Sequence, residues 1–127
     1  MDVAGEVRAA FERYELALRD GDVATLTELF WDDPRTRRFG VADRQQGAAE
    51  NAEWRRAHPS VPAGRRLRDT VVLPLGDGAA VVTTLFENPG LFDHPGGAVE
   101  GRQSQTWFRF PQGWRIVAAH VSEVPLG

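Results

Sequence analysis

The 127-residue sequence contains no cysteine and no lysine, and it has only one tyrosine and one methionine. Without cysteine, the chain can form neither a disulfide framework nor a thiolate metal site. Its net charge is −3, with 15 basic and 18 acidic side chains, which gives no electrostatic basis for binding nucleic acid or an anionic membrane. We therefore expect neither nucleic acid nor a membrane among its partners.

Long apolar runs are also missing. No segment is long and apolar enough to span a bilayer, and the N-terminus has no basic region followed by an apolar one, as a signal peptide would. We therefore expect a cytoplasmic protein. A chain of this length is expected to form one domain, residues 1–127, with a core that needs no cross-link.

Motifs for metals and phosphates are absent as well. The three histidines do not cluster, and no set of histidine and acidic residues has the spacing of metal ligands. No glycine-rich phosphate loop opens a predicted helix, since the glycines at 76–78 fit a hairpin turn. We expect neither a metal nor a cofactor.

The first half of the chain predicts three helices and a short strand. Residues 2–19 have apolar side chains at helical spacing, and this helix should end at Gly21. Asp22 can cap a second helix over 23–30, and a strand over 36–40 follows. A third helix, about 46–57, is only weakly patterned. The apolar positions of the first helix are Val3, Val7, Ala10, Phe11, Tyr14, Ala17 and Leu18.

The second half predicts four strands in meander order, near 66–75, 79–88, 100–110 and 114–124. The connection over 88–98 is long and rich in proline and glycine, so we expect it to hang over an edge of the sheet. Helices followed by a strand meander predict an α+β fold, with helices packed on one face of a curved antiparallel sheet. Such a cone has a natural ligand site at its mouth.

The last two strands form a hairpin around residues 111–113. We expect a three-residue loop that pairs Phe110 with Trp114 and places Ser104 opposite His120. A two-residue loop would place Gln105 opposite the histidine instead. A strand face that carries His120 and Ser122 beside Ile116 and Ala118 would form a polar pocket wall. No acid is evident to orient a Ser104–His120 pair, so we do not expect a serine nucleophile, and a lone strand histidine is more often structural.

Tyr14 and an arginine of the first strand are the strongest candidates for chemistry. Tyr14 lies in the apolar stripe of the first helix, and a buried phenol needs a hydrogen-bond partner, either a backbone carbonyl or a substrate oxygen. Arg37 and Arg38 alternate across the strand, so periodicity leaves open which one points inward, or whether both are solvated. An inward arginine would bind a carboxylate. Trp31 lies near the expected cavity mouth and could contact a ligand.

Several motifs resemble the AtzH-like family, which includes the HpxZ-like proteins of oxalurate catabolism and lies in the SnoaL-like, nuclear-transport-factor-2-like superfamily. They are Arg38–Val41, Gly47, Gly101–Trp107 and Gly113–Ser122. The resemblance covers nearly the whole chain. It implies a cystatin-like cone, with three N-terminal helices on a curved antiparallel sheet, and a homodimer formed through the outer sheet face. Glu50, Asn51 and Glu53 in the third helix depart from the family pattern.

The resemblance also implies work on small molecules beside amidases. One class of members looks like a hydrolase of 1,3-dicarboxyurea, and its proposed tyrosine and arginine match Tyr14 and Arg38. Our hypothesis is therefore a cofactor-free hydrolase of a small carboxylated urea-like amide. Arg38 would bind a carboxylate, Tyr14 would polarise the carbonyl or protonate the leaving nitrogen, and Trp31, Ser104 and His120 would contact substrate or water.

Two other functions remain open on the sequence. The chain could be a non-catalytic ligand-binding or accessory subunit of an amidase partner, with a closed cavity and an apolar outer sheet face. It could also be a proton-transfer or cyclase enzyme of the SnoaL type. That function needs a buried carboxylate near the cavity, for which Asp43 and Glu87 are the candidates.

Overall fold

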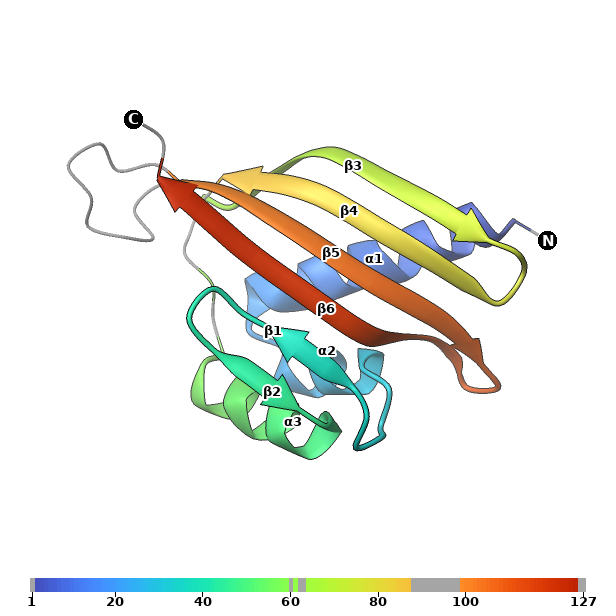
Figure 1. The fold of residues 1–127 in the computed structure, drawn as a ribbon, viewed down its shortest axis with the longest axis horizontal. Coiled ribbons are helices and arrows are strands. Elements are labelled where there is room, and N and C mark those ends of the chain that lie inside the picture. The colour runs from blue at the N-terminus through green and yellow to red at the C-terminus, as the bar shows by residue number, and fades with distance from the viewer. Residues whose placement is uncertain (1, 60, 62–63, 88–98, 126–127) are drawn as a thin grey trace.

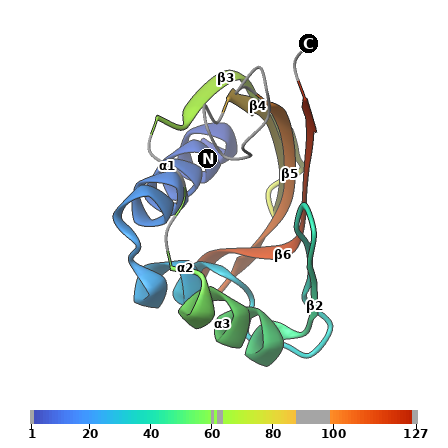
Figure 2. The same cartoon turned by 90° about the vertical axis from the view of Figure 1, so that its left-hand side faces the viewer.

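A computed structural model describes residues 2–59, 61, 64–87 and 99–125. Three helices, α1, α2 and α3, lie on one face of a six-stranded curved sheet with strand order β2-β1-β6-β5-β4-β3 (Figures 1 and 2). Neighbouring strands are antiparallel except β1 and β6, which run parallel. The elements are α1 (Val3–Asp20), α2 (Val23–Leu29), β1 (Arg37–Phe39), β2 (Arg44–Gln46), α3 (Ala48–Ala57), β3 (Arg66–Leu75), β4 (Ala79–Glu87), β5 (Val99–Phe110) and β6 (Gly113–Pro125). The predicted α+β cone is confirmed.

The ends of the first two helices follow from their capping residues. The Asp2 side chain accepts a hydrogen bond from the backbone of Gly5, and Gly21 ends α1 in the left-handed conformation with φ 68°. The Asp22 side chain then caps α2 by accepting from the backbone of Thr25. This helix ends one residue before the predicted boundary, because Phe30 is extended and bridges to β6.

The hydrophobic core lies between α1 and the concave face of the sheet. The stripe on α1 packs with α2 against side chains of β4, β5 and β6, and Trp107 and Ile116 are completely buried at its centre. The core residues are Val3, Val7, Phe11, Tyr14, Ala17, Leu18, Leu26, Leu29, Phe30, Ala80, Val82, Trp107, Trp114 and Ile116. None of the described helices is long and apolar enough to cross a membrane.

The strand β2 is absent from the sequence-based prediction. Its residues, Arg44, Gln45 and Gln46, are polar and have low strand propensity. They form a strand because they pair antiparallel with β1, and Gln45 turns its side chain into the interior. Residue 46 therefore belongs to a strand, and α3 begins only after Gly47, whose φ of 95° breaks the helix.

The hairpin between β5 and β6 differs from the prediction in two ways that cancel. The loop has two residues, since Phe110 pairs with Gly113, so the predicted pairing with Trp114 is wrong. A bulge then adds one residue to β6 between the partners of Thr106 and Trp107. Beyond it, Ser104 lies opposite His120, as predicted.

The same bulge changes which side chains of β6 face inward. Ile116 is buried, whereas Ala118 and His120 are exposed on the outer face. The prediction that these three share one face is therefore wrong. The inward positions beyond the bulge are Ala119 and Val121, which pair with Gln105 and Gln103 of β5. The expected connection over 88–98, with His94, lies outside the described residues.

Candidate functional site

Tyr14 occupies the inward face of α1 and is only 3% exposed. Its ring meets Phe30 edge-on, with centroids 6.2 Å apart, so the start of the segment after α2 holds the phenol against the sheet. The same side chain lines a small cavity together with residues of β1, β5 and β6. The phenol is therefore a buried polar group at a cavity, and not simply one more member of the apolar stripe.

Arg38 is the inward-facing arginine of β1. It is buried, while Arg37 beside it is half-buried and donates a hydrogen bond to the backbone carbonyl of Pro34. The Arg38 Nη1 atom donates to Asp43 Oδ1 and to Gln45 Oε1, each at 2.8 Å. The guanidinium also stacks over Trp54 of α3, 4.4 Å from the ring centroid. Among the described residues Nε and Nη2 make no hydrogen bond, which leaves one edge of the fork available for a carboxylate.

The small cavity brings Tyr14 and Arg38 together. Its volume of about 10 Å³ is close to the space one water molecule needs. The residues that line it are Tyr14, Arg38, Phe39, Gln103, Gln105, Ala119, His120 and Val121. The two glutamines come from the inward face of β5 and supply both hydrogen-bond donors and acceptors. The sequence analysis gave Gln105 only as the alternative partner of His120 in a two-residue loop, and it missed Gln103.

The side chains of His120 and Ser104 leave the sheet on the outer face, whereas Tyr14 packs against the inner face. Both are exposed, and they lie opposite one another on the outer face. His120 still reaches the rim of the small cavity, where Phe39 meets its ring edge-on at 5.6 Å. Ser104 is not among the cavity's lining residues. The structure therefore brings His120, but not Ser104, to Tyr14 and Arg38.

Arg55 of α3 is a buried cation that sequence reasoning missed. It is 4% exposed, and no carboxylate among the described residues pairs with it. The pKa of Arg55 is lowered from its ordinary value, chiefly by burial and also by the charge of Arg38, whereas Tyr14, which hydrogen-bonds to its side chain, and Asp43 act in the opposite direction. Its Nη2 atom is buried without a hydrogen-bond partner. Since a guanidinium stays charged in proteins, this position favours an anion.

Asn51, one turn earlier on α3, is buried in the same way. It is 4% exposed, and its Oδ1 atom has no hydrogen-bond partner among the described residues. Leaving a buried donor or acceptor unpaired costs about 1–3 kcal/mol. The weak apolar pattern of α3 gave no signal of this polar face, because a helix without an apolar stripe can equally be exposed on all sides.

The carboxylates near the cavity are already paired. The Asp43 carboxylate accepts hydrogen bonds from Arg38 and Gln45, and Glu87 forms ion pairs on the surface. Glu15 is buried, but Arg65 binds it. No carboxylate is therefore among the described residues that line the small cavity, and the described residues contain no group of three or more His, Asp or Glu that could hold a metal.

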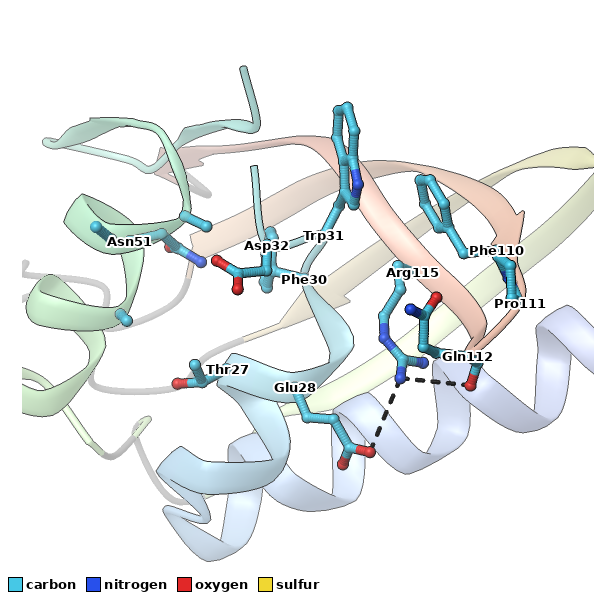
Figure 3. A pocket seen from close by; sticks show the side chains of 13 residues that line it. Thr27, Glu28, Phe30, Trp31, Asp32, Asn51, Phe110, Pro111, Gln112 and Arg115 are labelled. Carbon is cyan, nitrogen blue, oxygen red and sulfur yellow. Dashed lines mark hydrogen bonds and ion pairs between the residues drawn. The ribbon is translucent and has the colours of Figure 1, made fainter. Parts of the chain in front are cut away.

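A second, larger cavity of about 710 Å³ lies between α2, α3 and the tip of the β5–β6 hairpin (Figure 3). Trp31 lies here, stacked on Phe110 at 5.3 Å, and not at the small cavity. Phe30 and Asn51 also line it, so they form part of the wall between the large cavity and the Tyr14–Arg55 pair. In Figure 3 the side chain of Asn51 extends from α3 in the direction of Asp32.

Comparison with known proteins places the chain in a family. The model of the AtzH-like family matches residues 1–125. A protein of unknown function from Pectobacterium atrosepticum, assigned to the DUF3225 family, is 46% identical, with a TM-score of 0.86 over 98% of this chain and 92% of its own. A cystatin-like fold protein from Burkholderia xenovorans is 41% identical, with a TM-score of 0.89 over 99% and 95%.

A nuclear transport factor 2-like superfamily protein from Salmonella enterica is 25% identical, with a TM-score of 0.72 over 98% of this chain and 94% of its own. Among curated proteins, none matches. The motifs in the sequence and the family match agree, and the chain belongs to the AtzH-like family.

Proposed function

We propose that the protein is a cytoplasmic, cofactor-free hydrolase of a small carboxylated urea-like amide, of the 1,3-dicarboxyurea type. The observation that supports this proposal is the meeting of one buried phenol, Tyr14, with two buried guanidiniums, Arg38 and Arg55. Asp43 balances only one of the two positive charges. A small anion would supply the missing negative charge, and the phenol would lie beside it.

In this mechanism the protein binds, polarises and protonates. The Nε–Nη2 edge of Arg38 binds a substrate carboxylate in a bidentate manner. Tyr14 donates its proton toward the carbonyl oxygen, or to the nitrogen that leaves when the C–N bond breaks. Water adds to the carbonyl carbon and gives up a proton that restores the Tyr14 phenol, while the C–N bond breaks and the nitrogen leaves in its protonated form. The cavity beside Tyr14 has the size of one water, and Gln103, Gln105 and His120 would orient that molecule there.

The large cavity offers the space for the substrate itself. Its volume exceeds that of a small urea derivative, whereas the small cavity takes only the nucleophile. Phe30 and Asn51 line the large cavity on one side and lie next to Tyr14 and Arg55 on the other. Displacement of these side chains would bring a ligand from the large cavity to the phenol.

The Tyr14→Phe substitution tests the hydrolase. We expect kcat on 1,3-dicarboxyurea to fall at least about 100-fold, because the proton donor is lost, while the fold remains intact by circular dichroism. Arg38→Met should raise KM, and Arg37→Met is the matched control on the half-buried neighbour. Unchanged kinetics in Tyr14→Phe would remove the phenol from the mechanism, and an inactive wild-type protein would contradict the hydrolase itself.

A non-catalytic role is the second candidate, and two observations favour it. The cavity at Tyr14 is small, about 10 Å³, and large apolar side chains are exposed on the outer face of the sheet. These are Val71, Leu73 and Leu75 of β3 and Phe108 of β5. We propose that this face pairs two copies of the chain or binds an amidase partner. Sedimentation velocity gives the mass of wild type and of Leu73→Glu, each alone and mixed with a candidate amidase. The mass distinguishes a homodimer, a hetero-complex and a monomer.

A further inference from the structure

The buried face of α3 is polar throughout. Its two buried residues are Asn51 and Arg55, one helical turn apart, and no apolar residue of this helix is fully buried. A helix normally packs on a protein through an apolar stripe. Here the helix turns an amide and a guanidinium toward the interior instead.

Each of these residues has one atom without a hydrogen-bond partner, and the two atoms are complementary. Asn51 Oδ1 can only accept a hydrogen bond, and Arg55 Nη2 can only donate one. Residues four apart on a helix are neighbours on its surface, yet these two atoms do not bond to each other. A group that satisfies both must therefore present a donor and an acceptor side by side.

The positive charge of Arg55 limits which ligand groups can bind to Asn51 and Arg55 together. Arg38 has Asp43 and Arg65 has Glu15, whereas Arg55 has no acidic partner among the described residues. A carboxylate alone would satisfy Arg55 but not the Asn51 oxygen. An ammonium group would satisfy the oxygen but would be repelled by the guanidinium. An anionic ligand with an N–H group next to a carbonyl or carboxylate oxygen satisfies both.

We infer that Asn51 and Arg55 form a recognition site for the –NH–C(=O)– unit of an anionic ureido ligand, with Asn51 accepting from the N–H group and Arg55 donating to the oxygen. This assignment rests on the proposed function and gives it a specificity determinant. Asn51 lines the large cavity (Figure 3). Arg55 lies beside Tyr14, so a ligand bound across the pair spans the wall between the cavity and the phenol.

The test compares two ligands that differ only at the group proposed to donate a hydrogen bond to Asn51. N-carbamoylglycinate carries a ureido N–H, and succinamate has a CH₂ group in its place. By calorimetry, we expect wild type to bind N-carbamoylglycinate about tenfold more tightly, the value of one lost hydrogen bond in a closed site. In Asn51→Leu this preference should disappear while the affinity for succinamate is retained. In Arg55→Met both affinities should fall at least about tenfold, and in Arg56→Met, its exposed neighbour, neither should change.

A further variant adds the missing negative charge to the site. Asn51→Asp places a carboxylate one turn from Arg55, so we expect a higher Tm and a loss of affinity for both ligands. A higher Tm without loss of affinity would mean that the pair is structural, and the inference would be wrong. It would also be wrong if wild type binds neither ligand, or if the preference survives in Asn51→Leu.

These outcomes are independent of catalysis. If wild type does not hydrolyse 1,3-dicarboxyurea but shows the Asn51-dependent preference, the recognition site stands and the hydrolase fails. If hydrolysis is observed but the preference does not depend on Asn51, the hydrolase stands and the recognition site fails.

Discussion

The guanidiniums of Arg65 and Arg55 are both buried, but they differ in their hydrogen-bond and ion-pair partners. Arg65 donates to Glu15 at 3.0 and 3.3 Å and to Gln103 at 3.4 Å, and it stacks 4.0 Å above the ring of Phe86. Arg55 has neither a carboxylate nor a partner for its Nη2 atom among the described residues. The chain neutralises the first charge itself, which is typical of a structural pair, and the second has no counter-charge among the described residues.

The Arg65 cluster also joins distant parts of the chain. Glu15 comes from α1, Gln103 from β5, and the Gln103 amide donates to Glu15 at 3.2 Å, which closes a triangle of hydrogen bonds. Arg65 and Glu15 neutralise each other within this triangle, so neither charge is left for a ligand. Substituting three arginines in turn, one in each kind of environment, tests this contrast.

The largest effect is expected from Arg65→Met. Glu15 would remain buried without its cation, so we expect the free energy of unfolding at pH 7 to fall by about 3–5 kcal/mol. Urea unfolding followed by tryptophan fluorescence measures this value. The double variant with Glu15→Gln should recover part of the loss, because the uncompensated charge is then removed. A loss below about 1 kcal/mol in Arg65→Met would show that the triangle contributes little.

Arg55→Met should behave in the opposite way. It removes an unpaired buried charge, so we expect a free energy of unfolding within about 1 kcal/mol of wild type, or above it. Turnover and anion binding should nevertheless be lost. The same urea titrations, with the kinetic assay beside them, give both values. A loss of stability as large as that in Arg65→Met would mean that Arg55 is structural too, and the contrast would collapse.

The smallest effect is expected from Arg35→Met, at an exposed ion pair. Arg35 hydrogen-bonds to Asp33 at 2.9 Å and holds the pKa of that carboxyl below its usual value. Because the folded pKa is lowered, the pair stabilises the protein above the unfolded pKa of Asp33 and stops doing so as the pH falls through the folded one. Thermal unfolding should show a slight deficit for Arg35→Met at pH 7 and none near pH 2.

The fold could be predicted from the sequence where periodicity or capping is strong. Asp22 and Gly21 mark helix ends through their own chemistry, and the α1 stripe identifies the core. The strand β2 could not be predicted, because polar residues become a strand there only through pairing with β1. The bulge in β6 leaves no local signature either, so the outward orientation of His120 could not be predicted.

The residues of the candidate site also fall into those that the sequence could predict and those that it could not. Tyr14 could be found because a phenol in an apolar stripe stands out, and Arg38 became the choice through the family resemblance. Periodicity could not choose it, since a three-residue strand has no pattern to read. Asn51 and Arg55 could not be found, because a helix with a polar buried face looks like an exposed helix when only its sequence is known.

The extra residue in β6 has a consequence for how this protein can change over evolutionary time. Lengthening or shortening the hairpin at its tip alters a solvent-exposed turn and leaves the remote ends of both strands as they are. Deleting one residue at the bulge would instead exchange the two sides of the strand, bringing an imidazole in and sending two small apolar groups out. A single codon at the bulge thus decides which side chains of β6 line the small cavity, whereas changes at the tip of the hairpin leave those side chains unchanged.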